Sequence, residues 1–316
     1  MRLCTFTLRG EDERRQRAGA VVGSRVFELE ARGSVRELLA SGRSLARLKT
    51  EGSGYEVSRA RFHAPVPRPG KILATIVNTQ AMLGGEDVRL DRPRVDMKAP
   101  STVIGPGETV LAPPSGVRPE VELAAIVGRR LAGASESEAA EGIAGYTVLN
   151  DVTAPVDSRE DAYEAYRRDR ATGAIRKSVM RGPLFRSKNH DTFCPMGPWI
   201  VTSDDVDVSD LEMSTWFGGF KVQEGSTSEY LFGPAKIASY LSGFLTLEPG
   251  DVISCGSVGW TKEALGDLDP TEFVLPKTDG ALELEVEGIG KLRNPVSTPK
   301  RGGAAHGARA QPKTRT

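Results

Sequence analysis

Residues 118–128 constrain the fold more than any other part of the chain. Their apolar run is interrupted by Glu122, and Glu120 lies just before it. Side chains two residues apart on a strand point to the same face, so both carboxylates share a face with Ala124 and Ile126, which we expect in the core. Two like charges on a buried face cost free energy unless a cation holds them. The alternative is that both glutamates lie at a solvated strand edge.

A second apolar run supplies a third carboxylate. Residues 144–149 lead into Asn150 and Asp151, so the end of this strand presents Asp151. Together with Glu120 and Glu122 it forms an all-oxygen set without histidine or cysteine, which suits Mg²⁺, Mn²⁺ or Ca²⁺ better than zinc. The sequence therefore predicts a divalent-metal site, with an ordinary turn role for Asp151 as the alternative.

Composition bounds the class of protein. The 316 residues include 35 glycines and 20 prolines but only 6% aromatics, which favours a strand-rich α+β fold over a helical bundle. Lysine plus arginine equals aspartate plus glutamate, 42 each, so no net charge directs the chain to nucleic acid or to an anionic membrane. Three widely spaced cysteines without a CxxC motif predict reduced thiols in a cytoplasm. Without an apolar signal core or a run of about 18 apolar residues, we expect neither secretion by that route nor a membrane span.

Proline and glycine mark a boundary in the chain. Residues 61–70 carry three prolines and a final glycine, a composition typical of a linker. We therefore expect a small N-terminal α+β domain over residues 1–64 and a larger unit over residues 70–297. Residues 298–316 are basic and rich in glycine, alanine and proline, which predicts a disordered tail.

One segment between these landmarks is unusually charged. Residues 157–160 have the pattern of a capping box, and the charged run over residues 162–170 ends near Gly173. We expect a helix here, with Tyr163 and Tyr166 one turn apart. It would be either a solvated surface helix or a lid on the site.

Seven short motifs follow one another in a fixed order. They are PVPRPGKI (65–72), IGPG (104–107), EVEL (120–123), AGYTVLNDV (144–152), DTFCPMGPW (191–199), LEPGDVI (247–253) and GIGKLRNPV (288–296). Together they closely resemble the fumarylacetoacetate hydrolase family over most of the larger unit. The resemblance implies a mixed β-sandwich or roll, usually dimeric, so we expect a homodimer. It also implies that Glu120, Glu122 and Asp151 hold a divalent metal, Mg²⁺ or Mn²⁺.

The resemblance also assigns roles in catalysis and substrate binding. Members of this family cleave C–C bonds in β-diketo acids, decarboxylate oxo acids or isomerise enol acids, and each reaction builds enolate or oxyanion charge beside a carbonyl. Lys188 falls on the family's lysine and would bind anionic oxygen; the alternative is a surface lysine. Asn78 falls in the family's Asn-Tyr-x-x-His stretch, and Cys255 and Ser257 on its Thr-Gly-Thr loop, which implies substrate binding. As a thiol, Cys255 is more readily a buried structural residue than a nucleophile.

One departure from the family pattern bears on the reaction. The histidine of the Asn-Tyr-x-x-His stretch, which activates water in the hydrolases, is Met82 here, and a thioether cannot take a proton. Glu86 or Asp87 could supply a base from the same loop, or could belong to an ordinary polar loop. His190 lies near Lys188 in the sequence and is the other candidate base, unless it simply packs.

These observations lead to one expected function and three alternatives. We expect a cytoplasmic, Mg²⁺- or Mn²⁺-dependent enzyme that hydrolyses a C–C bond in a small β-dicarbonyl or oxo acid. Decarboxylation and isomerisation are alternatives, because they do not need an activated water. A metal- or ligand-binding homologue without catalysis is the third. Zero net charge and the lack of interleaved basic and aromatic residues argue against a nucleic-acid partner.

Overall fold

The computed structural model describes residues 1–31, 33–45, 48–83, 88–180, 182–268, 272–276 and 280–299. The strands are β1 (Arg2–Leu8), β2 (Arg17–Val22), β3 (Arg25–Leu29), β4 (Thr50–Glu56), β5 (Ala60–Phe62), β6 (Ile72–Thr75), β7 (Val95–Lys98), β8 (Val103–Ile104), β9 (Val110–Leu111), β10 (Val121–Val127), β11 (Ile143–Asn150), β12 (Tyr163–Arg168), β13 (Ile175–Met180), β14 (Cys194–Thr202), β15 (Glu212–Phe217), β16 (Phe220–Ser226), β17 (Val252–Ser257), β18 (Gly280–Val286) and β19 (Gly290–Ser297). The helices are α1 (Val35–Ala40), α2 (Gln80–Leu83), α3 (Glu136–Gly142), α4 (Pro155–Glu160), α5 (Phe185–Lys188), α6 (Pro234–Ser242) and α7 (Lys262–Leu265), with 3-10 turns η2 (Val57–Arg59), η3 (Pro100–Thr102) and η4 (Thr227–Glu229).

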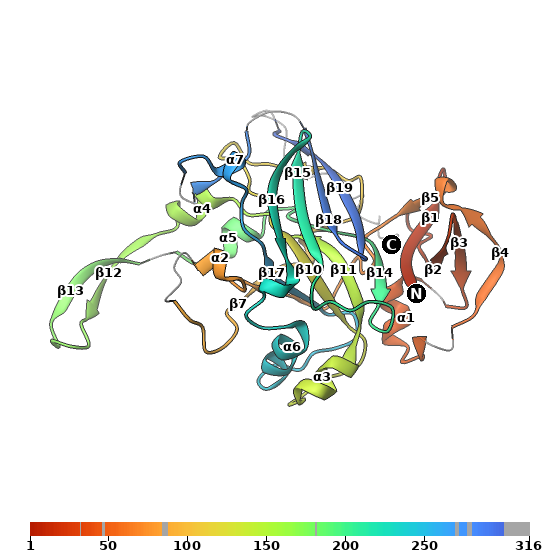
Figure 1. The fold of residues 1–316 in the computed structure, drawn as a ribbon, viewed down its shortest axis with the longest axis horizontal. Coiled ribbons are helices and arrows are strands. Elements are labelled where there is room, and N and C mark those ends of the chain that lie inside the picture. Colours follow the sequence, from red (N-terminus) through yellow and green to blue (C-terminus); the bar gives the residue numbers. More distant parts are fainter. Residues whose placement is uncertain are drawn as a thin grey trace, which may run out of the picture.

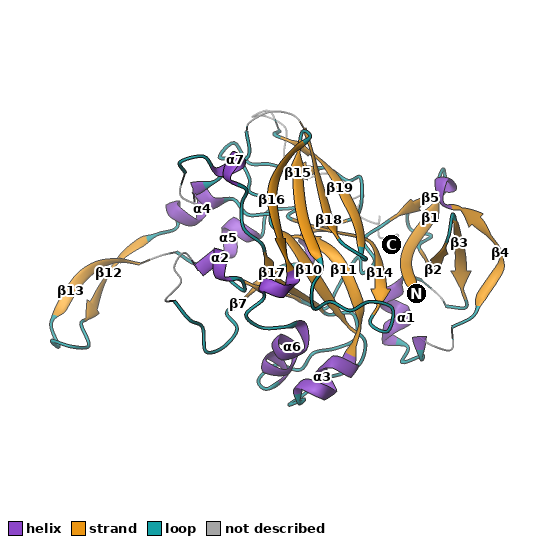
Figure 2. Cartoon of the chain, viewed as in Figure 1, coloured by secondary structure: helices purple, strands orange, loops and turns teal. Residues whose placement is uncertain are grey.

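Two sheets form the layers of the structure (Figures 1 and 2). The large mixed sheet has the order β4-β3-β2-β1-β14-β11-β10-β17-β6-β7, with β5 added to β1 and β8 added to β14. The smaller sheet, β16-β15-β18-β19-β9, packs on the central strands β10, β11 and β14. Helices lie at the periphery of these layers (Figure 2). The strand-rich α+β fold expected from the sequence is confirmed.

Strand β10 is the most enclosed element of the large sheet. All of its residues are buried, because both of its faces are covered. Leu123, Ala125 and Val127 pack in the core that contains the smaller sheet. Ala124 and Ile126 pack on the opposite face, in the cluster that includes helix α1, as the sequence predicts. Apart from Glu122, the strand is a continuous apolar run, as a strand covered on both faces requires.

The N-terminal strands continue the large sheet. Strand β1 pairs with β14, with Arg2 opposite Val201 and Leu3 opposite Ile200, so hydrogen bonding runs across the expected domain boundary. The division into residues 1–64 and 70–297 therefore stays a prediction. The predicted tail over residues 298–316 lies almost entirely outside the described residues.

The helix predicted over residues 162–170 is wrong. This segment is strand β12, which pairs with β13 in an antiparallel hairpin. The helix α4 begins earlier, at Pro155, so the expected capping residue Asp157 lies inside it instead of before it. Proline suits the first position of a helix because that position needs no backbone donor.

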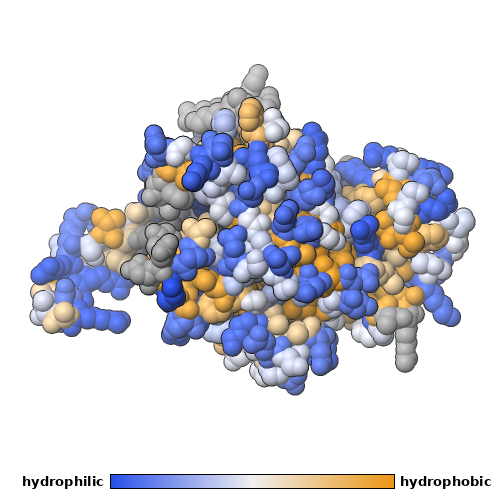
Figure 3. Space-filling view, in the orientation of Figure 1, coloured by the Kyte–Doolittle hydropathy of each residue, from blue (hydrophilic) through white to orange (hydrophobic). Residues whose placement is uncertain are grey.

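Side-chain interactions within residues 163–180 explain why this segment forms a hairpin and not a helix. The Asp169 side chain accepts hydrogen bonds from two backbone N–H groups of the turn, at 2.9 and 2.8 Å, and Gly173 closes the turn at φ +71°. Lys177 on β13 pairs with Glu164 on β12 at 2.6 Å. The hairpin projects away from the body (Figure 1) and carries mostly hydrophilic residues on the side seen in Figure 3. Its apolar residues are also exposed, for example Tyr166 at 74%.

The contrast between β10 and the hairpin gives a stability test. We expect Leu123→Ala to lower the free energy of unfolding by about 2–5 kcal/mol, because this fully buried side chain leaves a cavity. The matched control, Val179→Ala on β13, truncates a side chain that is 72% exposed and should change that free energy by less than about 0.5 kcal/mol. Urea unfolding followed by circular dichroism measures both. Equal losses in the two variants would contradict this account of the core.

Candidate active site

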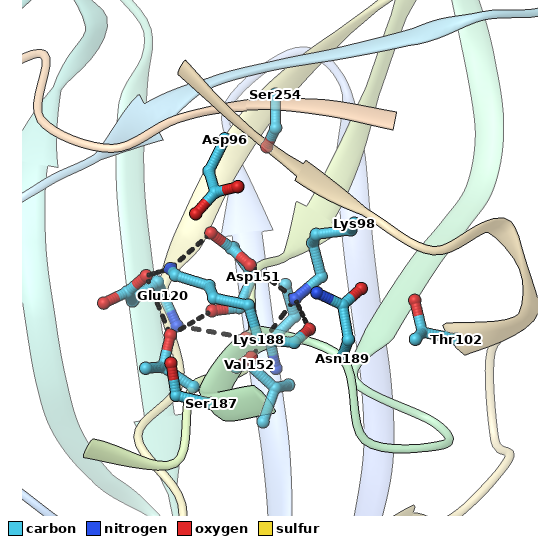
Figure 4. Close-up of polar contacts among 12 residues, drawn as sticks. Asp96, Lys98, Thr102, Glu120, Asp151, Val152, Ser187, Lys188, Asn189 and Ser254 are labelled. Atoms are coloured by element: carbon cyan, nitrogen blue, oxygen red, sulfur yellow. Dashed lines mark hydrogen bonds and ion pairs between the residues drawn. The ribbon is translucent and has the colours of Figure 1, made fainter. Parts of the chain in front are cut away.

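Three carboxylates converge at one end of strands β10 and β11. Figure 4 shows two of them, Glu120 and Asp151, with Lys188 between them. Glu122 lies on β10, Glu120 just before it and Asp151 just after β11. The antiparallel ladder sets Glu120 opposite Asp151, whose backbone N–H donates to the Glu120 carbonyl at 2.9 Å. One oxygen of each of the three carboxylates lies within 4.8 Å of the others. The structure thus brings together the three residues that the sequence proposes as metal ligands.

Burial makes it costly in free energy to keep all three carboxylates of this cluster charged. Glu120, Glu122 and Asp151 are only 4%, 1% and 1% exposed. Burial and the neighbouring Asp151 charge raise the pKa of Glu122 from 4.5 to about 8, although the Lys188 charge and the Ser254 hydrogen bond oppose this rise. The Ser254 hydroxyl and the Gly256 N–H, the latter at 2.8 Å, both donate to Glu122 Oε2.

Two buried lysines and an arginine balance the carboxylates. Lys188 Nζ donates to Glu120 Oε2 at 2.6 Å and to Asp151 Oδ2 at 2.5 Å. Lys98 Nζ lies 2.6 Å from Asp151 Oδ1, and Arg118 pairs with Glu120 Oε1 at 2.7 Å. Burial alone would raise the pKa of Asp151, but the Lys188 and Lys98 charges outweigh it and lower that pKa. Burial likewise opposes the charge on Lys188, yet the three carboxylates raise its pKa above the ordinary value.

The two lysines differ in whether an N–H donor remains for a ligand. An ammonium group has three N–H donors. Lys98 Nζ donates hydrogen bonds to the Val152 carbonyl at 3.2 Å and to the Lys188 carbonyl at 2.7 Å, and it also forms an ion pair with Asp151 Oδ1. Lys188 Nζ has two oxygen partners among the described residues. Lys98, enclosed by three oxygens, therefore fixes the site, while Lys188, with two, keeps one donor for a bound molecule.

The donor set fits a hard divalent cation. It consists of carboxylate oxygens, which Mg²⁺, Mn²⁺ and Ca²⁺ prefer. Buried Asp151 Oδ1 faces Lys98 but accepts no hydrogen bond within the described part of the chain. The raised pKa of Glu122 indicates that the protein's own cations do not fully compensate its negative charge. A cation held by Glu120, Glu122 and Asp151 would give Asp151 Oδ1 a further partner and would add positive charge beside Glu122.

One candidate base, His190, does not contact the carboxylate cluster, and the other candidates lie outside the described residues. His190 Nε2 lies 2.6 Å from Asp157 Oδ2, and its ring packs on Phe193 with a centroid separation of 4.9 Å. The structure therefore pairs His190 with Asp157 and not with the cluster around Lys188. Glu86 and Asp87 lie outside the described residues. Met82 is on the short helix α2, half-buried.

The three proposed substrate-binding residues have protein partners. The Asn78 amide donates to the carbonyl oxygens of Phe232 and Cys255, at 2.8 and 2.7 Å. Burial raises the pKa of Cys255 above its ordinary value, which keeps the group a thiol. Ser257 Oγ accepts a hydrogen bond from Gln223 Nε2 at 2.9 Å. Their contacts organise the β17 side of the site, next to the Gly256 amide that binds the cluster.

Sequence reasoning missed several residues that build the site. Arg118 lies two residues before Glu120, so the period of a strand could have placed it on the same face. Lys98 and Ser254 had no such local signal, because their strands reach the cluster through pairing with other strands.

The fold and the site define a strand-rich α+β protein with a buried carboxylate–lysine centre suited to a divalent cation. Residues 71–297 match the sequence profile of the fumarylacetoacetate (FAA) hydrolase C-terminal domain. The chain belongs to the fumarylacetoacetate hydrolase family, as its motifs suggested.

Two relatives illustrate the range of the family. The chain is 32% identical over 242 residues to the 2,4-didehydro-3-deoxy-L-rhamnonate hydrolase of Sphingomonas sp. (strain SKA58), covering 75% of this chain and 76% of the relative. It is 30% identical over 287 residues to a mitochondrial oxaloacetate tautomerase of Bos taurus, covering 88% of this chain and 84% of the relative. Family members are thus enzymes that catalyse different reactions.

Solved structures share the fold. The 5-carboxymethyl-2-hydroxymuconate delta-isomerase from Mycobacterium smegmatis superposes with a TM-score of 0.72 at 28% identity, covering 95% of this chain and all of that one (100%). The maleylpyruvate hydrolase from Sphingobium sp. SYK-6, in complex with manganese(II) and pyruvate, has a TM-score of 0.68, 22% identity and the same coverage, 95% and 100%. No helix within the described residues has the length and apolar character to cross a membrane.

Without a metal ion, the raised pKa of Glu122 predicts how stability depends on pH. Between its usual pKa of 4.5 and the folded-state value of about 8, the folded protein keeps a proton that the unfolded chain has lost. The free energy of unfolding should therefore fall as pH rises through this window, by at most about 1.4 kcal/mol per pH unit. Urea unfolding in the presence of a chelator measures this slope.

Two variants isolate the contribution of Glu122. Glu122→Gln should remove most of the slope, because the amide does not titrate. Glu283→Gln changes an exposed side chain on β18 and should leave the slope unchanged. The same slope in wild type and Glu122→Gln would show that burial does not raise the pKa of this carboxyl group.

Proposed function

We propose that this protein is a Mg²⁺- or Mn²⁺-dependent enzyme that hydrolyses a C–C bond in a small β-dicarbonyl or oxo acid. The observation that carries the proposal is the buried cluster of Glu120, Glu122 and Asp151 beside Lys188, in a chain of the fumarylacetoacetate hydrolase family. The hydrolase from Sphingomonas supports this reaction by its name. The bound ion would polarise the substrate carbonyl and stabilise the enolate that C–C cleavage releases.

Charge balance supports an anionic substrate. By formal charge, the buried cations Lys188, Lys98 and Arg118 equal the buried carboxylates Glu120, Glu122 and Asp151 in number, so a bound divalent ion adds two positive charges to this buried set. An oxo acid brings one carboxylate, and its enolate adds a second negative charge as the reaction proceeds. Charges interact strongly where water is excluded, so this centre would stabilise an enolate more than the neutral carbonyl it comes from.

The protein's own groups have separate tasks in this proposal. Glu120, Glu122 and Asp151 hold the ion. The remaining N–H of Lys188 donates to the substrate carboxylate or to the enolate oxygen. Lys98 keeps Asp151 ionised and fixes the Lys188 backbone through its carbonyl.

Keto–enol isomerisation or decarboxylation is the second candidate, and Met82 favours it. Family hydrolases use a histidine at this position to activate water, and a methionine cannot. Isomerisation needs a proton carrier but no attack by water, and decarboxylation needs mainly an electron sink. The names of the Bos taurus and Mycobacterium smegmatis proteins support isomerisation.

The manganese complex of the maleylpyruvate hydrolase supports Mn²⁺ as one usable ion. We further propose a homodimer in the cytoplasm, both expected from the sequence and its resemblance.

An assay with acylpyruvates and oxaloacetate in Mg²⁺ or Mn²⁺ tests the function. Enol absorbance and CO₂ release are followed together, with product analysis by NMR. We expect loss of enol signal without CO₂, and a drop of at least about 10²-fold in kcat/KM for Glu122→Gln, because the metal site loses a charged ligand. Glu283→Gln is the control and should match wild type.

The outcomes separate the candidates. Carboxylic acid and ketone products indicate hydrolysis, whereas an isomerised substrate indicates a tautomerase. CO₂ release that Met82→His does not increase indicates a decarboxylase. Metal binding without turnover of any substrate would contradict the proposal and favour a non-catalytic binding protein.

A further inference from the structure

Asp96 on strand β7 is a fourth carboxylate that faces the candidate metal centre. Asp96 and Lys98 are two residues apart on one strand, so their side chains leave the same face of the sheet. Lys98 Nζ reaches Asp151 Oδ1 at 2.6 Å. The face that carries Asp96 is therefore the face of the cluster.

The register across the sheet places Asp96 along the cluster as well. Asp96 is opposite Ala74 on β6, and Ala74 is opposite Ser254 on β17. Ser254 in turn donates to Glu122. The only side chain between Asp96 and Ser254 in this row is the methyl group of Ala74. In Figure 4 the Asp96 carboxylate points toward Asp151, with Ser254 beside it.

Asp96 differs from the three candidate ligands in exposure and in partners. It is half-buried, whereas the three ligands are at most 4% exposed. Its Oδ1 accepts a hydrogen bond from the Met97 N–H at 2.7 Å. Its Oδ2 accepts none from the described part of the chain. One carboxylate oxygen is thus available at the side of the site that solvent reaches.

The proposed reaction needs a group that carries a proton, and the residues considered so far do not supply one. Asp96 could be that group. Met82 has no basic atom, and His190 is paired with Asp157. Lys98 has three oxygen partners, and the cluster carboxylates are needed for the ion. Within the described residues of this face, Asp96 is the carboxylate that forms no ion pair and is not a candidate metal ligand.

We propose that Asp96 is a catalytic residue that carries the proton to and from the carbon next to the substrate carbonyl. This rests on the proposed function. In enolisation Asp96 Oδ2 takes the proton from that carbon, the C–H electron pair becomes the C=C bond, and the carbonyl π pair moves to oxygen. In the reverse direction the proton returns from Oδ2 to carbon. This second direction is the one that quenches an enolate released by C–C cleavage, so both candidate reactions use the same group.

Deuterium exchange of the methyl protons of pyruvate tests this step without a complete reaction. The full chain is incubated with pyruvate and Mg²⁺ in D₂O, and the exchange rate is followed by proton NMR. Asp96→Asn keeps the shape of the side chain and its acceptor for Met97, so the fold should persist. We expect the exchange rate to fall by about 10²–10⁴-fold, the range for losing a general base.

A matched control and a binding measurement exclude other causes. Asp207→Asn changes an exposed aspartate with a similar backbone hydrogen bond, from Ser209 N–H at 3.0 Å, and should exchange like wild type. Mn²⁺ affinity, measured by electron paramagnetic resonance, should be unchanged in Asp96→Asn. Added formate should restore part of the exchange in Asp96→Ala, because a small carboxylate can occupy the vacated space.

Each result decides something. Exchange at the wild-type rate in Asp96→Asn overturns the role of Asp96 and leaves the proposed function standing. A loss of Mn²⁺ affinity in that variant overturns it too, because Asp96 would then be a metal ligand. No exchange by the wild-type protein overturns the proposed enolate chemistry, and the role of Asp96 with it.

Discussion

The Asp151 carboxylate, held between two buried lysines, is the interaction on which the site depends. One oxygen contacts Lys188 and the other contacts Lys98. These lysines come from α5 and β7, so the centre forms only when both elements dock against the end of β11. A buried carboxylate without such partners would cost several kcal/mol. The same constraint makes the cluster of three carboxylates sensitive to every charge brought near it.

The two-sheet architecture supports this arrangement. Strand β10 is covered on both faces, so it is buried along its whole length and holds Glu122 on a rigid scaffold. Sites built on strands hold their side chains more accurately than sites on loops. The cluster stands at one end of the strands, where β7 and α5 add groups from other parts of the chain. The fold thus supplies both the burial that strengthens charge interactions and the cations that make the burial tolerable.

Local sequence rules found the part of the site that local geometry determines. Glu120 and Glu122 follow the period of a strand, and Asp151 lies at a strand end, so their convergence could be predicted. Lys98 and Asp96 reach the centre only through the order β7-β6-β17-β10, a non-local pairing that no pattern in their own segment reveals. The helix predicted over residues 162–170 failed for a related reason. A capping-box pattern is local evidence, whereas the Asp169 turn and the pairing with β13 decided the structure.

The central claim is that Glu120, Glu122 and Asp151 together hold one divalent ion. A crystal structure of the protein with Mn²⁺, with anomalous data collected at the manganese edge, tests it most directly. The account predicts one strong anomalous peak bonded to an oxygen of each of these three residues, with Lys188 beside it. A peak elsewhere in the molecule, or none while Lys188 still spans Glu120 and Asp151, would contradict the claim.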